Sequence, residues 1–517
     1  MLKKITINSL SVLLVFIIFV SVLSLNVFAE ENDKYGGKII VPIESVSLPR
    51  MDPHYIDSIG RKNIGLFIAE PLLRFVGGEY IPVLAEDWEV SEDAKTFTIF
   101  IRKNVLFHNG KTLTASDVKE NFGRIINKKL VDVGHLTTVE SLNVLDDYIL
   151  EINLSESNPF FLSKLQEIVI VDPDSWVDID QDDGVIGTGP FQYDVDSYRA
   201  EAKQTLNRFD DYWGGLPYLE EVEIVVTGGK DATRIQLEKG EVHVALFAEL
   251  SSANAFQSAG MQVIPFGRIN WASIALNQKK LGLPIRKAIN YAFNPEVILN
   301  SPAVFAGYGI LQKTIAYPDT DFYRPELGYG YDPDRAREIL DEAGWVDSGD
   351  GVRQKNGEKL VLNFPSREGE GWTQASQMIQ SMLRQVGIDS KIIVQPISTF
   401  YSNIRDEEYD WDLAWWLLNA PPEPSIATIN FDARHSWSTI TVKIDELQEK
   451  LEEAESTVDV DERAELIREL QQIHHDYAVS ASGVWMKQIH VARSELQGVK
   501  VNSIGHFYNF HNWWLQK

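Results

Sequence analysis

"LAEDWEVSEDAKTFTIFIRKNVLFHNGKTLTASDVKENF" (Leu84–Phe122) passes directly from a strand pattern into a helix pattern. Thr96–Ile101 is rich in β-branched and aromatic residues with partial alternation, which predicts a β-strand. Thr114 and Asp117 stand at the spacing of a capping box, with Asp in place of the usual Glu or Gln, and we expect them to open a helix over Val118–Ile126. A strand and a capped helix in one short stretch indicate a mixed α and β protein.

The same interleaving of strand and helix patterns continues along the rest of the chain. Further strands are predicted at Glu221–Val226, Leu360–Phe364 and Lys391–Ile397, and further helices at 295–299, 333–343 and within 444–477. At 517 residues the chain is too long for one hydrophobic core, so two or three lobes are expected. Because no repeat period and no Gly/Ser linker separates them, we expect α/β lobes built from discontinuous segments.

The balance of charges excludes some classes of partner. The chain has 48 Lys and Arg against 75 Asp and Glu, which gives a formal net charge of −27. A chain with this charge repels nucleic acids and anionic membrane surfaces. We therefore expect no nucleic acid partner.

The N-terminal segment has the pattern of a secretory signal peptide. Lys3 and Lys4 precede an apolar run over Leu10–Leu25, and Val27 and Ala29 occupy the small-residue positions of a cleavage site. We expect cleavage that removes residues 1–29; an uncleaved membrane anchor is the alternative. The chain has no cysteine, so it carries no disulfide and no lipid-modified N-terminal Cys. The expected location is therefore periplasmic or extracellular.

The sequence contains no recognisable catalytic or cofactor-binding motif. A thiol nucleophile is excluded, and the G-x-S-x-G, H-E-x-x-H and G-x-x-x-x-G-K-[ST] motifs are absent. His474 and His475 are neighbours on a predicted helix and point about 100° apart, so they are poorly placed to share one metal ion. We expect a binding protein that is not an enzyme and has no metal or cofactor; a secreted hydrolase with an acidic pair is the alternative from another class.

Several motifs occur in a fixed order over nearly the whole chain. They are MDPHY (Met51–Tyr55), IAEPLLR (Ile68–Arg74), the stretch Leu84–Phe122, GTGPF (Gly187–Phe191), DDYWGGLPYLEEVEI (Asp210–Ile224), IRKAINYAF (Ile285–Phe293) and YDPDRAREILDEAGW (Tyr331–Trp345). In this order they resemble the bacterial extracellular solute-binding proteins of family 5, which serve peptide and nickel ABC importers. The resemblance implies an α/β, periplasmic-binding-protein-like fold of type II with three lobes.

The resemblance also implies how the lobes are divided. Lobe I would combine 37–60, 185–278 and 495–517, an inserted lobe II would take 61–184, and lobe III would take 279–494. Two crossings between lobes I and III would form a hinge, and the ligand would lie in the cleft between them.

The function that the resemblance implies is that of a receptor for an ABC importer. The receptor would capture a peptide-like solute, as a monomer, and deliver it to permease subunits in the membrane. An oligosaccharide or a nickel chelate is the alternative ligand within the same family. The absence of a phosphate-binding loop agrees with this role, since ATP hydrolysis would belong to a separate subunit.

The resemblance places "WDLAWWLLNAPPEPS" (Trp411–Ser425) at the rim of the ligand cleft. Adjacent side chains of a strand face opposite sides, so one of Trp415 and Trp416 should pack inward while the other faces the cleft. The alternative is that both rings are buried in the core. Asn419 would offer its amide to a ligand, or would cap the turn.

Four further residues are candidate ligand contacts. Glu423 stands where many peptide-binding members carry an acidic Asp-Pro-Asp turn, and it would pair with a ligand ammonium or lie in solvent. His435 lies near the position of a nickel-type histidine, or is a hydrogen-bonded loop residue. Trp271 and Tyr55 would form aromatic walls of the cleft; a core role is the alternative.

Overall fold

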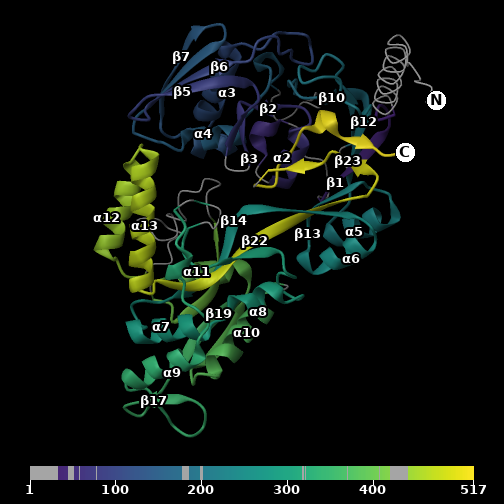
Figure 1. Ribbon diagram of the computed structural model, residues 1–517. Helices are drawn as coiled ribbons and strands as arrows, with labels where there is room; N and C mark the ends of the chain where they lie inside the picture. The colour runs from purple at the N-terminus through teal and green to yellow at the C-terminus, as the bar shows by residue number, and fades with distance from the viewer. Residues whose placement is uncertain are drawn as a thin grey trace, which may run out of the picture.

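A computed structural model describes most of the chain that follows the N-terminal segment (Figure 1). The described residues are 33–44, 52–56, 59–76, 79–176, 185–197, 199, 202–316, 320, 322–369, 371–406, 408–419, 441–502 and 504–517. The predicted signal peptide lies outside these ranges. Among the helices inside them, none combines the length and the apolar character that crossing a bilayer would need.

Lobe I, at the upper right of Figure 1, is built on a four-stranded sheet with the order β1-β12-β11-β10. β1 runs parallel to β12, and the other neighbours are antiparallel. The elements of this lobe are β1 (Lys38–Ile43), α2 (Ile59–Gly65), β10 (Phe191–Tyr193), β11 (Lys203–Arg208), β12 (Glu221–Val226), α5 (Lys230–Lys239), α6 (Ala253–Ser258), β23 (Leu496–Gln497), β24 (Lys500–Val501), β25 (Phe507–Tyr508) and β26 (Trp514–Leu515). Segments from both ends of the chain therefore share this lobe.

Lobe II, at the upper left of Figure 1, contains the stretch Leu84–Phe122. Its antiparallel sheet has the order β5-β6-β8-β7, and helix α3 packs on it. The elements are β2 (Glu70–Pro71), β3 (Leu73–Val76), β4 (Glu79–Pro82), β5 (Ala85–Val90), β6 (Thr96–Ile101), α3 (Ala115–Lys128), β7 (Val139–Asp146), β8 (Ile149–Leu154), α4 (Phe161–Lys164) and β9 (Val169–Ile170). The predicted strand is confirmed residue for residue, and the predicted helix extends beyond Ile126 to Lys128.

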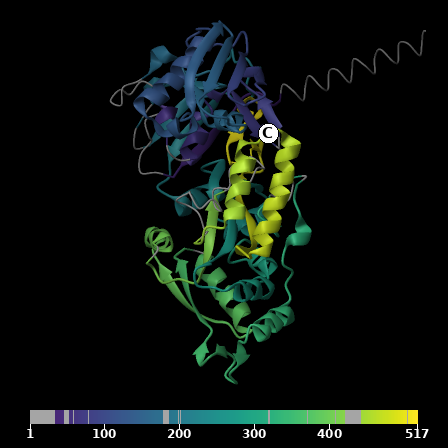
Figure 2. The same cartoon turned by 90° about the vertical axis from the view of Figure 1, so that its left-hand side faces the viewer.

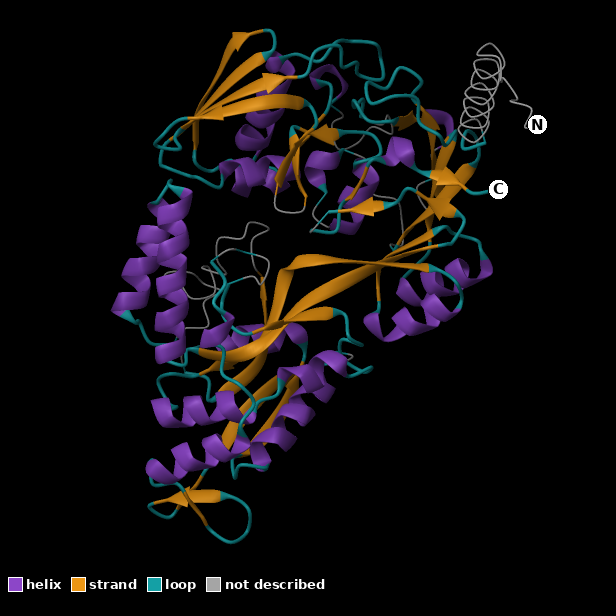
Figure 3. Cartoon of the chain, viewed as in Figure 1, coloured by secondary structure: helices purple, strands orange, loops and turns teal. Residues whose placement is uncertain are grey.

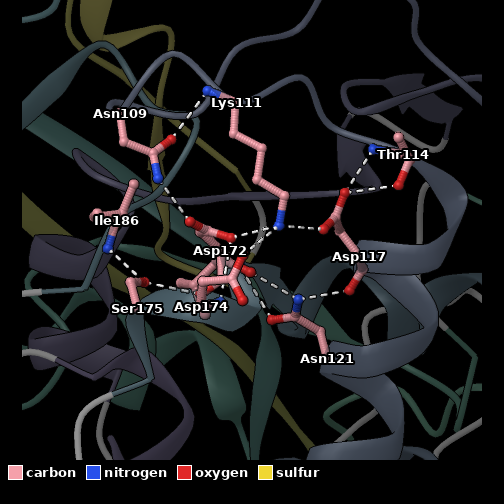
Figure 4. Close-up of polar contacts among 10 residues, drawn as sticks. Asn109, Lys111, Thr114, Asp117, Asn121, Asp172, Asp174, Ser175 and Ile186 are labelled. Atoms are coloured by element: carbon pink, nitrogen blue, oxygen red, sulfur yellow. Dashed lines mark hydrogen bonds and ion pairs between the residues drawn. The ribbon is translucent and has the colours of Figure 1, made fainter.

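The capping residues of α3 also belong to an ionic cluster that fixes three segments of lobe II (Figure 4). The Asp117 carboxylate accepts from the backbone N–H and the hydroxyl of Thr114, both at 2.8 Å. The ammonium of Lys111 lies 2.9 Å from Asp117, 2.8 Å from Asp172 and 3.1 Å from Asp174. Burial alone would lower the pKa of Lys111, but the hydrogen bonds of these carboxylates raise it. The cluster therefore joins the HNGK turn, α3 and the 172–174 segment.

The GTGPF segment lies so close to the backbone of Ile68 that its glycines are sterically required. A Cβ added at Gly187 would lie 2.1 Å from the carbonyl oxygen of Ile68. Gly189 donates its N–H to the same oxygen at 2.7 Å, and Phe191 donates to the carbonyl of Phe67 at 3.0 Å. Because only glycine allows this approach, the segment joins the chain at the boundary of lobes I and II.

Lobe III, the lower part of Figure 1, carries helices around the parallel pair β19–β20. Its elements are α7 (Leu283–Ala292), α8 (Pro295–Asn300), β15 (Gly309–Gln312), α9 (Pro333–Glu342), β16 (Val346–Asp347), β17 (Arg353–Lys355), β18 (Glu358–Lys359), β19 (Val361–Arg367), α10 (Trp372–Arg384), β20 (Asp389–Gln395), α11 (Ile397–Arg405), β21 (Leu413–Asn419), α12 (Asp445–Ser456) and α13 (Val460–Asp476). The two predicted helices within 444–477 are thus α12 and α13.

Lobes I and III are connected by two long antiparallel strands, which cross the middle of the molecule (Figure 3). β14 (Gln262–Leu276) has 15 residues and β22 (Ser480–Ala492) has 13. They form a sheet of order β13-β22-β14-β21, in which β13 is Val244–Ala248. The same sheet thus begins in lobe I and ends in lobe III. The lobe boundaries that the resemblance implies, such as 61–184 for lobe II, stay predictions.

A second connection is made by the α12–α13 hairpin, which stands upright and reaches towards lobe II (Figure 2). Val458, at the tip of the hairpin, packs against the hydrophobic core of lobe II. The guanidinium of Arg463 lies 4.7 Å from the ring centroid of Phe160 in lobe II. Lobe III therefore contacts lobe II at a point remote from the two crossing strands.

Candidate ligand-binding site

A cavity of about 330 Å³ lies where β13 and β22 meet the helices of lobe III. The residues that line it are Lys230, Phe247, Ala248, Glu249, Leu250, Ser251, Ala303, Val304, Phe305, Arg367, Glu368, Gly369, Gly371, Trp372, Ile397, Trp415, Met486 and Gln488. The first six come from lobe I, and most of the others come from lobe III. The cavity is thus shared by the two lobes that β14 and β22 join.

The two adjacent tryptophans of β21 lie on opposite faces of the sheet, as expected for a strand. Trp415 packs against Phe293 and Trp372, and it contributes to the cavity wall. Trp416 packs in a separate hydrophobic cluster with Phe400 and Tyr401. Both side chains are only 1% exposed. Trp415 is thus the member of the pair that lines the cavity, and the roles of both tryptophans as ligand contacts stay predictions.

Trp271 does not line this cavity. It lies on β14, a central strand between β22 and β21, and its side chain is fully buried. Its ring packs 5.6 Å from that of Trp485, in the same cluster as Trp416. The ring therefore packs in the core of this structure, and its role as a ligand contact stays a prediction.

Tyr55 lies away from the cavity. Its half-buried ring packs against the core of lobe II, and the Arg124 guanidinium lies 5.5 Å from the ring centroid. Arg124 in turn forms a buried ion pair with Asp52 at 2.5 Å and lies 3.0 Å from His54 Nδ1. Residues 52–55 thus attach the chain to lobe II.

The remaining predicted contacts follow Trp416 in the sequence. The backbone of Asn419 ends β21, where it pairs with Asn270 of β14. Glu423 and His435 lie outside the described residues. Their roles as ligand contacts, and that of the Asn419 side chain, stay predictions.

Arg367 is the cavity residue with the most distinctive chemistry. Its guanidinium carbon lies 3.7 Å from the ring centroid of Trp372, and its Nη1 donates to the Tyr401 hydroxyl at 3.3 Å. Its Nε is buried without a hydrogen-bond partner, and no described acidic side chain lies within ion-pair distance. Burial lowers the pKa of Arg367, although the neighbouring Tyr401 raises it. A partly buried guanidinium with no acidic partner among the described residues is a binding group for a planar anion such as a carboxylate.

The helix next to Arg367 adds to the positive potential at this end of the cavity. α10 begins at Trp372, and Gly369 and Gly371 at its start also line the cavity. The N-terminus of a helix carries unpaired N–H groups and the positive end of the helix dipole. Together with Arg367, it favours a negatively charged ligand group here.

The lobe I wall of the cavity carries charges of both signs, Lys230 and Glu249. Glu44 lies close to both residues; burial raises its pKa, Lys230 lowers it and Glu249 raises it. The cavity therefore carries charges of both signs on each lobe, Arg367 and Glu368 on lobe III and Lys230 and Glu249 on lobe I. Such a wall suits a ligand that carries more than one kind of polar group.

Arg367 is absent from the residues predicted from the sequence. The signal that points to it is its place at the C-terminal end of the parallel strand β19, directly before a glycine-rich turn and a helix. In open α/β folds, ligands bind outside the carboxyl ends of parallel strands.

The two neighbouring histidines of α13 make separate contacts. The buried His474 forms a hydrogen bond through Nε2 with the Ser480 hydroxyl at 2.9 Å, while His475 stacks on Tyr329. Burial lowers the pKa of His474 to about 3. In the described part of the chain, no group of three or more His, Cys, Asp or Glu side chains is arranged to hold a metal ion.

Comparison with known proteins identifies the family to which the chain belongs. The model of bacterial extracellular solute-binding proteins, family 5 middle region, matches residues 79–437. The dipeptide-binding protein of Escherichia coli is 25% identical over 469 residues, covering 83% of this chain and 86% of that protein. The nickel-binding periplasmic protein of the same organism is 25% identical over 474 residues, covering 84% and 86%.

A solved structure has the same fold. The substrate-binding protein CtaP of an ABC transporter from Listeria monocytogenes matches with a TM-score of 0.78 and 19% sequence identity. The match covers 94% of this chain and all of that one. The expected three-lobed, periplasmic-binding-protein-like α/β fold is confirmed.

Proposed function

Because the chain belongs to the bacterial extracellular solute-binding proteins of family 5, we propose that it is the receptor of an ABC importer and holds a peptide-like solute between lobes I and III. The receptor delivers this solute to permease subunits in the membrane. It acts as a monomer outside the cytoplasm, after cleavage of the N-terminal signal peptide.

The observation that supports this proposal most is the environment of Arg367. A peptide ends in a planar carboxylate, which accepts two parallel N–H bonds from a guanidinium. Arg367 is stacked on Trp372 and has no carboxylate partner among the described residues. The terminal carboxylate of the ligand would be the acidic partner of Arg367. It would accept hydrogen bonds from the guanidinium, whose Nε is otherwise buried without a partner.

The size of the cavity limits the length of the ligand. Ligand sites in proteins typically range from about 300 to 1,000 Å³, and this cavity lies at the lower end with about 330 Å³. A solute of dipeptide size suits such a volume better than a long peptide. The polar wall formed by Lys230 and Glu249 is available to the other end of that solute.

A nickel chelate is the second candidate ligand, because chelators also carry carboxylates and a nickel-binding protein is among the relatives. An oligosaccharide is less well supported, since Trp271 and Trp416 are buried away from the cavity and the Trp415 side chain is only 1% exposed. A peptide and a nickel chelate would both place a carboxylate at Arg367.

The proposal is tested by identifying the solute that the protein carries. The signal-free chain is purified without denaturation, and its bound small molecules are released and measured by mass spectrometry. We expect short peptides that are recovered unchanged after prolonged incubation with the protein. Recovery of cleaved peptides would indicate the hydrolase instead, and recovery of a metal with an organic chelator would favour the second candidate.

A further inference from the structure

We propose that Tyr401, itself held by Trp416, is a positioning residue that orients the guanidinium of Arg367 for ligand binding. This inference rests on the proposed function, in which Arg367 binds a ligand carboxylate. Tyr401 does not line the cavity, so its effect on the ligand passes through Arg367.

The first support is the way in which Arg367 is held. A long arginine side chain has many rotamers, and an ion pair with a neighbouring carboxylate is the usual means of fixing it. No described acidic side chain lies within ion-pair distance of Arg367. Its orientation instead comes from two aromatic neighbours, the Trp372 ring at 3.7 Å and the Tyr401 hydroxyl at 3.3 Å.

The second support comes from the two faces of β21. Trp415 lies 6.3 Å from Trp372, which stacks on the guanidinium. Trp416, on the other face, lies 5.5 Å from Tyr401 with the ring planes at 88°. Each tryptophan thus packs behind one of the two residues that hold Arg367. The adjacent aromatic pair is an indirect part of the site, although neither ring is exposed.

The third support is that the position of Tyr401 is itself fixed. It follows Phe400 on α11, and Phe400 is fully buried and packs 6.0 Å from Trp416. The guanidinium of Arg405 lies 5.7 Å from the Tyr401 ring centroid. A hydroxyl on a ring held from several sides can direct one N–H of Arg367, so that the other donors are left for the ligand.

The test compares affinity for a free-acid dipeptide with affinity for its C-terminal amide. The probe is the dipeptide that binds the wild-type protein most tightly in a panel of free acids, measured by isothermal titration calorimetry. Tyr401→Phe keeps the ring and removes only the hydroxyl. We expect it to weaken binding of the acid about fivefold to tenfold and binding of the amide less than twofold, so that the preference for the acid falls.

Tyr409→Phe is the matched control. The Tyr409 hydroxyl accepts from Gln395 Nε2 at 2.5 Å on the same lobe, and Tyr409 does not line the cavity. We expect its acid-to-amide preference to equal that of the wild type. Trp416→Phe should lower the preference in the same direction as Tyr401→Phe, even where it also lowers the melting temperature.

The outcomes separate this inference from the proposed function. If Arg367→Gln removes the acid preference while Tyr401→Phe leaves it unchanged, the positioning role is refuted and the proposed function stands. If no dipeptide binds the wild type, or if Arg367→Gln keeps the acid preference, the proposed function fails and this inference with it.

Discussion

The guanidinium of Arg367 lies 3.7 Å from the ring centroid of Trp372, at the wall of the cavity shared by lobes I and III. This stacking places a partly buried cation at the C-terminal end of β19, close to the start of α10. In a chain with a net charge of −27, a cation without a described acidic partner is a specific feature of the site. The fold thus places Arg367 where it can bind an anionic group of a ligand.

Replacing Arg367 should weaken ligand binding without unfolding the protein. Arg367→Ala removes charge-assisted hydrogen bonds that are each worth about 1.5–3 kcal/mol, so we expect the dissociation constant to rise by about 10-fold to 100-fold. Arg367→Lys should recover only part of this loss, since an ammonium neither stacks on Trp372 nor forms two parallel bonds with a carboxylate. Calorimetric titration with a dipeptide measures both effects. Arg335→Ala, an exposed arginine on α9, is the control that should bind as the wild type does.

The tryptophans of β21 should both contribute strongly to stability. Trp415→Ala and Trp416→Ala each leave a large hole in a separate hydrophobic cluster, and we expect each to cost about 3–5 kcal/mol of unfolding free energy. Urea denaturation followed by circular dichroism measures the loss. A loss below about 1 kcal/mol at either position would contradict the buried placement of that ring.

Acid should destabilise the protein below about pH 6.5, because several histidines are buried in the neutral form. Burial lowers the pKa of His490 to about 3 and that of His108 to about 4. His490 forms a hydrogen bond with the N–H of Phe247 at Nδ1 and with the carbonyl of Gly505 at Nε2, which requires the neutral ring. The unfolded chain binds these protons near the ordinary pKa of about 6.5, so stability falls as the pH falls towards 4.

Urea midpoints between pH 7.5 and 4.5 measure this dependence. We expect His490→Gln to be less stable than the wild type at pH 7.5 and to lose less stability on acidification. A slope that is the same in the variant and the wild type would show that His490 does not contribute.

The α12–α13 hairpin should influence the equilibrium between open and closed forms. Val458 packs on lobe II and Arg463 lies over Phe160, so Phe160→Ala removes part of the contact between lobes II and III. A cation–π contact at such a site is worth about 0.5–2 kcal/mol, and we expect ligand affinity to fall about threefold to tenfold. Small-angle scattering of the ligand-free protein should give a larger radius of gyration. Lys450→Ala, in an exposed ion pair on α12, should leave both quantities unchanged.

Local sequence patterns were sufficient to predict the elements but not the cavity. Alternation predicted the strand Thr96–Ile101, and the spacing of Thr114 and Asp117 predicted the start of α3, because these signals depend on neighbouring residues only. The opposite faces of Trp415 and Trp416 follow from strand geometry in the same way. Their burial does not, because it depends on residues distant in the sequence.

Long-range packing decided the surroundings of Trp271 and Arg367, which local patterns do not describe. Trp271 is buried because β14 became a central strand between β21 and β22, a pairing that no local pattern specifies. Arg367 became a candidate binding residue only when α10 and α11 brought Trp372 and Tyr401 to it. The chemistry of the site therefore depends on tertiary contacts more than on a motif.

The most direct measurement is a calorimetric titration of the wild-type protein with one dipeptide as the free acid and as the C-terminal amide. We expect the free acid to bind at least about tenfold more tightly, and this difference to disappear in Arg367→Gln. Equal affinity of the wild type for both forms would contradict carboxylate recognition at Arg367.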